Sequence, residues 1–244
     1  MMNTNENKRL NNRQISTTNR LLAALPEAEF QRLVPNLEQV SFTLGEVLYE
    51  AGEHIRHAYF LDRNTLASVI SAMENGTSIE ACVVGSEGLV GIQAFLRTEA
   101  TPARIVVQVA GSAMKIRADI LREEFNRGGV LQELLLRYTH ALITQISQTA
   151  ACNQLHLIEE RLSRWLLTIN DRLAGDIPLT HELISRRLGA HRSSVNEVAG
   201  ILRRKGMISY RRGKITILNR KELSSAACEC YGIIKEQFDC KLGV

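Results

Sequence analysis

The sequence predicts an α+β protein with three parts: an N-terminal antiparallel β-roll, a long helix, and a C-terminal winged helix-turn-helix. Short β-prone segments separated by glycines fill residues 40–116, as in small β-rolls and sandwiches. After Gly128 and Gly129 the apolar residues follow steps of three and four, which indicates a helix. Two short helical patterns and a basic hairpin then follow within residues 179–221.

These patterns divide the chain into four segments. Residues 1–20 are polar and rich in Asn, which predicts a mobile arm. Residues 21–128 form the predicted roll domain, which opens with an amphipathic helix over 21–34 that offers four leucines and Val34 for burial. Residues 129–154 form the long helix, and residues 155–244 form the C-terminal domain with a final helix.

The roll is predicted from its alternating strands and turns. Segments such as "HAYFLD", "IEACVVG" and "ARIVVQVAG" are rich in β-branched and aromatic residues and end at turn signals. The segment "ENG" at 74–76 has the composition of a tight hairpin turn.

The long helix carries more apolar residues than one buried face needs. Leu135, Ile143 and Ile146 widen the stripe, so one side is expected on the roll and the other on a second copy of the chain. Polar residues in the stripe suit an interface between two helices, whereas a core helix of a monomer is the alternative. The predicted dimer contacts are Leu131, Leu134, Tyr138, Leu142, Gln145, Thr149 and Cys152.

The C-terminal domain opens with a helical stripe over 155–173, which Gly175 and Pro178 end. A helix capped by Thr180 follows, and Gly189 supplies the turn to a second helix that buries a stripe from Val195 to Leu202. The stripe leaves four side chains near the start of the second helix facing outward, where a recognition helix contacts base edges in the major groove. Arg suits guanine, Asn suits adenine, and Glu accepts from cytosine. The predicted base-reading residues are Arg192, Ser193, Asn196 and Glu197.

A two-stranded wing is predicted over "MISYRRGKITIL". Its turn carries Arg211, Arg212 and Lys214, which are placed to meet DNA phosphates. The charge distribution agrees, because residues 179–221 hold eleven Lys/Arg and two acids, a local charge of +9 in a chain whose total is +4. The cluster at 203–205 is equally well explained as a solvated helix end.

These motifs together resemble the Crp/Fnr superfamily of bacterial transcription regulators over roughly residues 21–223. The resemblance rests on "GSEGLVG", the long helix, "EERLSRWLL" and above all "LTHELISRRLGAHRSSVNEVAGILRRKGMI". It implies a cyclic-nucleotide-binding-like roll, a dimerising helix and a winged helix-turn-helix, with Arg192 at the position that contacts guanine. It further implies RNA polymerase as a candidate partner, and phosphate contacts from Thr180, His181, His191 and Ser194.

The effector is not identified by the sequence. Where cyclic-AMP receptors of this superfamily have Gly-Glu and Arg-Ser pairs, this chain has Gly91-Ile92 and Ala103-Arg104. Isoleucine cannot accept the ribose hydroxyl, so cyclic AMP is not expected, although "GSEGLVG" and Pro102 are a candidate frame for another small-molecule ligand. No cysteine precedes Cys82, which excludes the usual N-terminal iron–sulfur cluster.

No cofactor or metal ligand is expected. The five cysteines are scattered and odd in number, which suits reduced thiols rather than a disulfide framework. "CEC" at 228–230 with Cys240 suggests metal or redox sensing as an alternative, but Cys230 falls in the apolar stripe of the final helix and is expected to be a buried small hydrophobe. His54 and His57 are read as exposed loop histidines rather than haem ligands. The chain has neither a signal peptide nor a long apolar run, so a cytoplasmic location without membrane contact is expected.

The sequence therefore predicts a regulator, not an enzyme, that binds double-stranded DNA as a homodimer on an inverted-repeat operator. Two alternatives remain. In the first, the sensor is vestigial and DNA binding is constitutive or tuned by a protein partner. In the second, the roll is a cupin-type metal enzyme that uses His54 and His57. The cupin pattern has His-x-His where this chain has His-x-x-His, which disfavours the second.

Overall fold

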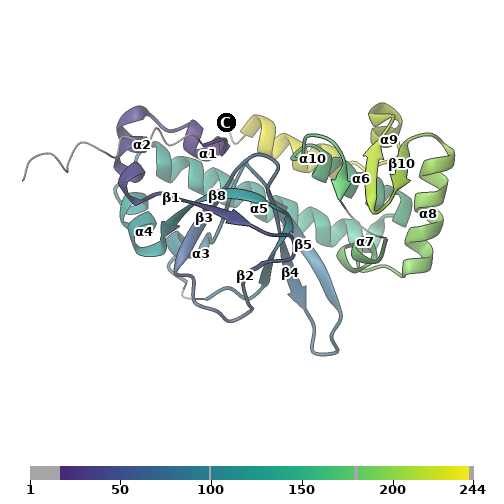
Figure 1. Ribbon diagram of the computed structural model, residues 1–244, viewed down its shortest axis with the longest axis horizontal. Helices are drawn as coiled ribbons and strands as arrows, with labels where there is room; N and C mark the ends of the chain where they lie inside the picture. Colours follow the sequence, from purple (N-terminus) through teal and green to yellow (C-terminus); the bar gives the residue numbers. More distant parts are fainter. Residues whose placement is uncertain (1–16, 99, 179–180, 242–244) are drawn as a thin grey trace, which may run out of the picture.

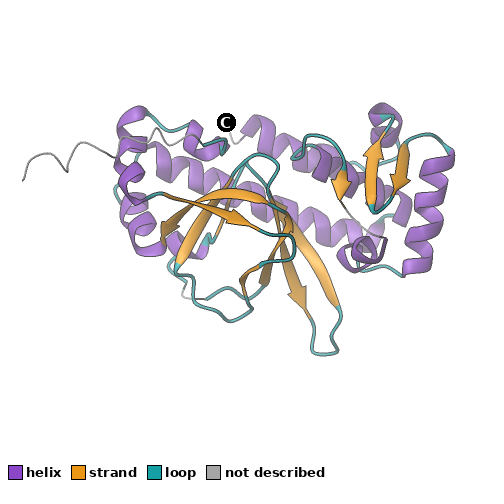
Figure 2. Ribbon diagram, viewed as in Figure 1, coloured by secondary structure: helices purple, strands orange, loops and turns teal. Residues whose placement is uncertain are grey.

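The long helix α5 (Val130–Leu155) is the axis around which the molecule is built. The structure is a computed structural model that describes residues 17–98, 100–178 and 181–241. Figure 1 shows the β-roll below α5, the C-terminal helix α10 (Cys230–Glu236) above it, and a smaller helical domain at its right-hand end. In Figure 2 the strands fall into two groups, the roll and a small sheet in that end domain. The predicted combination of antiparallel roll, long helix and winged helix-turn-helix is confirmed.

The N-terminal helix predicted over 21–34 is wrong in detail, because the segment forms two helices. These are α1 (Arg20–Ala23) and α2 (Glu27–Leu33), followed by a 3₁₀ turn, Val34–Asn36. Pro26 separates them, since a proline disfavours helical geometry in the residue before it.

The end of the predicted arm packs on the roll instead of remaining free. The Asn19 side chain is fully buried and donates to the carbonyls of Leu61, at 2.9 Å, and Gly88, at 2.8 Å. Its oxygen also accepts from the Leu22 N–H and so caps α1. The polar composition that predicted mobility includes a residue whose polar groups are satisfied inside the fold.

The roll consists of two four-stranded antiparallel sheets, in the orders β1-β8-β3-β6 and β2-β7-β4-β5. The predicted turn at 74–76 joins β4 to β5, and Gly76 has a positive φ of 80° there. The strands are β1 (Glu38–Phe42), β2 (Val47–Tyr49), β3 (His57–Leu61), β4 (Leu66–Ala72), β5 (Ser78–Val84), β6 (Leu89–Val90), β7 (Arg104–Val109) and β8 (Gly111–Arg117). Two helices, α3 (Gln93–Leu96) and α4 (Ala118–Asn126), complete the domain.

The α5 helix begins where the two glycines end the roll domain. Gly129 has a φ of 86°, and both carboxylate oxygens of Glu29 accept from the first helical N–H groups, at 3.1 Å from Val130 and 2.8 Å from Leu131. A carboxylate at a helix N-terminus satisfies unpaired donors and complements the helix dipole. The start of α5 is therefore tied to α2.

The residues predicted at the dimer interface lie on the face of α5 that packs against the rest of this subunit. All are buried within the single chain: Leu131, Leu134, Tyr138, Leu142, Gln145, Thr149 and Cys152. Tyr138 donates to the Leu89 carbonyl at 3.0 Å, and a Cβ on Gly88 would lie only 2.3 Å from its ring. Gln145 donates to the Val83 carbonyl at 3.3 Å. The stripe contains polar residues because the roll supplies their hydrogen-bond partners, and an interface is not needed to explain them.

The C-terminal domain follows after a two-residue break. Helix α6 (Ile158–Asn170) leads to β9 (Ile177–Pro178), α7 (His181–Leu188), α8 (Arg192–Arg204), β10 (Ile208–Arg211), β11 (Lys214–Ile217) and α9 (Arg220–Ser225). The small sheet has the order β10-β11-β9.

The last helix, α10, returns to the first half of the molecule. It packs on both α5 and α6 and continues as a π-helical segment, Gln237–Lys241. Ile234 and Phe238 join the same core as the roll and α5. No helix in the described part of the chain is long and apolar enough to cross a membrane.

Candidate nucleic-acid interface

Helices α7 and α8 form the helix-turn-helix, and their contact is apolar. Val195, Ala199 and Leu202 are buried on the inner face of α8, in one core with Ile184 of α7 and Trp165 of α6. Gly189, with a φ of 59°, supplies the turn between the helices. Because the inner face is occupied, the outer face of α8 points away from the protein.

The predicted base-reading residues all lie on that outer face. Arg192, Ser193, Asn196 and Glu197 are exposed, in the first two turns of α8. Figure 1 shows α8 at the far end of the molecule, with no element beyond it. The positions suit entry into a groove, and the contacts with bases stay a prediction.

The wing has a tight turn with a basic tip. β10 and β11 pair up to Arg211 and Lys214, and the two residues between them, Arg212 and Gly213, have φ values of 49° and 76°. Positive φ at both central positions is the type I′ hairpin turn. The three basic side chains, Arg211, Arg212 and Lys214, are exposed.

The predicted phosphate contacts at the helix ends are only partly described. Thr180 lies outside the described residues, and His181 is the first residue of α7. His191 is the N-cap residue of α8 and is exposed, whereas Ser194 is half-buried. Exposed groups at the start of α8 lie where a helix N-terminus favours an anion.

A buried carboxylate on the roll holds the C-terminal domain in place. Glu80 of β5 accepts from the indole N–H of Trp165 on α6 and from the Ser68 hydroxyl, both at 2.6 Å. Its second oxygen is 3.5 Å from Nε of Arg187 on α7. Burial raises the pKa of Glu80, and the Arg187 charge and these hydrogen bonds oppose that rise. One side chain of the roll thereby contacts two helices of the C-terminal domain.

A second buried carboxylate, Glu87 of "GSEGLVG", pairs with Arg172 at the end of α6. Oε1 of Glu87 lies 2.6 Å from Nε of Arg172 and 3.1 Å from the Gly85 nitrogen, and both charged side chains are almost fully buried. The Arg172 guanidinium also lies over the Phe238 ring, 5.1 Å from its centroid. The motif therefore joins the roll to α6 and to the C-terminal segment.

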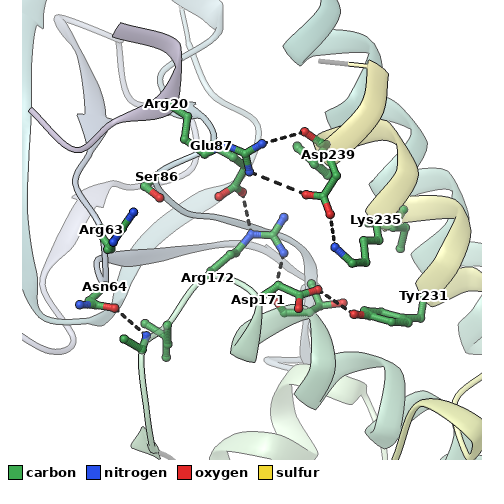
Figure 3. Close-up of a pocket in the computed structure, with 15 residues that line it drawn as sticks. Arg20, Arg63, Asn64, Ser86, Glu87, Asp171, Arg172, Tyr231, Lys235 and Asp239 are labelled. Atoms are coloured by element: carbon green, nitrogen blue, oxygen red, sulfur yellow. Dashed lines mark hydrogen bonds and ion pairs between the residues drawn. The ribbon is translucent and has the colours of Figure 1, made fainter. Parts of the chain in front are cut away.

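A cavity of about 370 Å³ opens beside this pair, between the roll, α6 and α10. Figure 3 shows its charged side chains directed at one another: Arg172 toward Glu87, and Arg20 and Lys235 toward Asp239. These ion pairs partner several charged side chains of the lining with one another.

The positions that correspond to a cyclic-nucleotide cassette have other roles. Ile92 packs against the core of the roll, and Ala103 is buried. Arg104 forms a surface ion pair with Glu50, Nε to Oε2 3.1 Å. His54 is exposed and His57 lies on β3, where burial lowers its pKa.

The structure also brings together four residues whose proximity the sequence did not predict, Cys152, His156, Cys228 and Cys230. The four-residue spacing of Cys152 and His156 at a helix end is a local signal that could have indicated two ligands on one face. Their meeting with residues 228 and 230 depends on the return of α10 to α5, which no local pattern indicates.

Comparison with known proteins agrees with this architecture. Residues 160–226 match the Crp-like helix-turn-helix domain. The fold is similar to that of FixK2 from Bradyrhizobium japonicum, with a TM-score of 0.69 and 15% identity over 79% of this chain and 98% of that one. The structure of a putative Crp/Fnr-family regulator from Eubacterium rectale has a TM-score of 0.66 and 17% identity over 85% of this chain and 97% of that one. The structure of the CRP-family regulator TTHB099 from Thermus thermophilus has a TM-score of 0.64 and 22% identity over 77% of this chain and 96% of that one. No curated protein matches the sequence.

Proposed function

We propose that this protein is a Crp/Fnr-family transcription regulator that binds an inverted-repeat DNA operator as a homodimer and is not an enzyme. The observation that carries the proposal is the outer face of α8. It presents Arg192, Ser193, Asn196 and Glu197 to solvent while its inner face is fully packed. Arg192 reads guanine through two hydrogen bonds, and Asn196 and Glu197 suit adenine and cytosine.

The wing supplies the contacts that do not depend on sequence. Its three exposed basic side chains lie at the tip, where a type I′ turn joins the last residue of β10 to the first residue of β11. His191 and Ser194, with Thr180 and His181, are proposed to meet phosphates at the ends of the two helices.

The exposed face of α5 is proposed as the dimer surface, in place of the buried stripe. Leu136, Ile143 and Ile146 are 50%, 57% and 39% exposed, large values for such apolar side chains. With Thr139 and Ala150 they follow steps of three and four, the spacing of a two-helix seam. A second α5 packed on this face would cover them and place one α8 in each half-site, about 34 Å apart.

Selection of random DNA sequences by the purified full-length protein tests the proposal. The expected result is an enriched inverted repeat whose half-sites lie one helical turn apart. An unstructured pool, or a motif without two-fold symmetry, would overturn it.

A second candidate is a regulator whose sensor is vestigial, so that DNA binding is constitutive or tuned by a protein partner. The observation that favours it is the set of Ile92, buried Ala103 and the Arg104–Glu50 pair at the cyclic-nucleotide positions. Titrating the selected operator with and without a metabolite extract separates the two, because only a working sensor changes the affinity.

A further inference from the structure

Three thiols and one imidazole meet at the junction of α5, α6 and α10. Sγ of Cys152 lies 3.5 Å from Sγ of Cys228, and Sγ of Cys230 lies 3.7 Å from Nδ1 of His156. The four donor atoms all lie within 4.8 Å of one another. The three cysteines are buried as a cluster of their own, and the His156 side chain is 17% exposed.

Two of the six separations match the edges of a tetrahedron around a single ion. Zn–S bonds of about 2.3 Å and Zn–N bonds of about 2.0–2.1 Å place neighbouring ligand atoms about 3.5–3.8 Å apart. The Cys152–Cys228 and Cys230–His156 pairs are already at that spacing, and the widest pair needs to close by about 1 Å. An iron–sulfur cluster would need its ligands farther apart, because they bind different iron atoms.

The surroundings of the histidine favour a bound cation. Nδ1 of His156 faces the sulfurs, while Nε2 lies 3.3 Å from the carboxylate of Glu229. A carboxylate on the distal ring nitrogen is the usual support of a metal-bound histidine, since it fixes the tautomer that leaves the other nitrogen free to coordinate.

The charge around the cysteines is also suitable. Arg164 of α6 is 3% exposed and interacts with Cys152, and its Nε has no hydrogen-bond partner among the described residues. A zinc ion with three thiolates and a neutral imidazole has a net charge of −1, which a buried guanidinium offsets.

We propose that Cys152, His156, Cys228 and Cys230 bind one zinc ion. Zinc is the ion that fits, because a closed set of three thiolates and one imidazole in tetrahedral arrangement is typical of structural zinc sites. All four positions are taken by protein ligands, so the ion has no open position for catalysis.

The site would join three segments at the point where the two halves of the molecule meet. Cys152 is in the last turn of α5, His156 is the extended residue between α5 and α6, and Cys228 and Cys230 lie at the start of α10. The ion would thus fix the break between the long helix and the DNA-binding domain. Any effect of the ion on operator affinity rests on the proposed function. The metal site itself does not depend on that function.

Metal analysis of the untagged full-length protein, purified under reducing conditions, tests the site. We expect about one zinc ion per chain, and none in the double variant Cys228→Ser/Cys230→Ser. Cys82→Ala is the matched control, because this buried cysteine lies on β5 outside the cluster and its variant should keep the metal. Protein without zinc that also fails to bind added Zn²⁺ would overturn the proposal.

Cobalt substitution and variants of His156 test the ligand set without disturbing the buried cysteines. Added Co²⁺ should give the visible spectrum of a tetrahedral ion with thiolate charge-transfer bands. His156→Cys should retain the metal through four thiolates, while His156→Ala weakens binding. Glu229→Gln should lower zinc affinity about 10–100-fold, unlike Glu222→Gln on α9. An octahedral cobalt spectrum, or equal zinc affinity in all four variants, would contradict the assignment.

Discussion

At the scale of single residues, position on α8 decides which polar side chains are predicted to contact bases. Arg192 and Arg203 have the same chemistry and are both exposed, yet Arg192 is at the first turn and Arg203 at the last. A recognition helix contacts bases mainly through its N-terminal residues, so the two arginines have different expected roles.

Arg192→Ala is expected to relax the base preference at one operator position and to cost about 1–3 kcal/mol of binding free energy. The reason is the loss of two hydrogen bonds to guanine, which no other base accepts in the same geometry. Comparing the sequences selected by the variant and by the wild type measures this. Arg203→Ala is the control and should leave the preference unchanged, and an identical selected motif for Arg192→Ala would contradict its assignment.

At the scale of elements, α5 has one apolar face that the subunit covers and one that it leaves exposed. The face with Tyr138 and Leu142 is covered by the subunit itself, and the face with Leu136 and Ile143 is not. A helix with two apolar faces buries both only when each is covered, and the subunit covers one of them.

Ile143→Lys is expected to weaken dimerisation on the order of 100-fold, because each dimer would lose two apolar contacts and gain two close like charges. Sedimentation equilibrium measures the dissociation constant. The matched control is Leu44→Lys, which changes an equally exposed apolar residue on the roll, and it should remain dimeric. A monomeric wild type, or a dimeric Ile143→Lys protein, would show that α5 is not the interface.

The wing is the second element with a separable role. Arg211→Gln with Arg212→Asn should weaken binding to all DNA sequences and reduce the slope of log K against log salt by about 0.9 for each phosphate that the wing no longer neutralises. Asn is chosen because position 212 has a positive φ, which Asn tolerates. Operator titrations at several salt concentrations measure the slope. Arg56→Gln with Arg63→Gln removes the same charge from the roll, and if both pairs alter the slope equally, the wing does not contact the backbone.

At the scale of the whole molecule, two buried carboxylates hold the C-terminal domain against the roll. Glu80 binds Trp165 and Arg187, and Glu87 binds Arg172. Both acids lie on or beside β5, and their partners lie on or at the ends of α6 and α7. Any change in the angle between the domains has to break these contacts or move both partners of each contact together.

Arg172→Met should lower the free energy of unfolding by about 3–5 kcal/mol, because it leaves the Glu87 charge buried and uncompensated. The double variant Glu87→Gln/Arg172→Met should lose less than the sum of the single losses. Urea denaturation of the wild type, the two single variants and the double variant gives the four free energies of unfolding that make up this double-mutant cycle. Arg117→Met, which breaks an exposed pair with Asp119, should cost no more than about 1 kcal/mol, and additive losses at 87 and 172 would mean that the two charges do not interact.

Much of the fold could be predicted because its signals are local. Glycines and β-branched residues marked the strands, and the stripe from Val195 to Leu202 marked the buried face of α8 and hence its outer face. The residues predicted at the dimer interface are buried within the single chain, since a helical stripe shows which side chains are buried but not what covers them. The single helix predicted over 21–34 is wrong, because the prediction relied on the run of leucines, whereas Pro26 divides the segment into two helices.

The sequence by itself determined the order of roll, long helix and winged helix-turn-helix and the face of α8 that is left exposed, because periodicity and turn chemistry act over a few residues. Only the tertiary structure decided which elements meet. The return of α10 to α5 brings Cys228 and Cys230 to Cys152 and His156, and the docking of α6 on the roll pairs Arg172 with Glu87. Contacts between residues 74 to 85 positions apart arise from packing of whole elements, which short-range patterns do not encode.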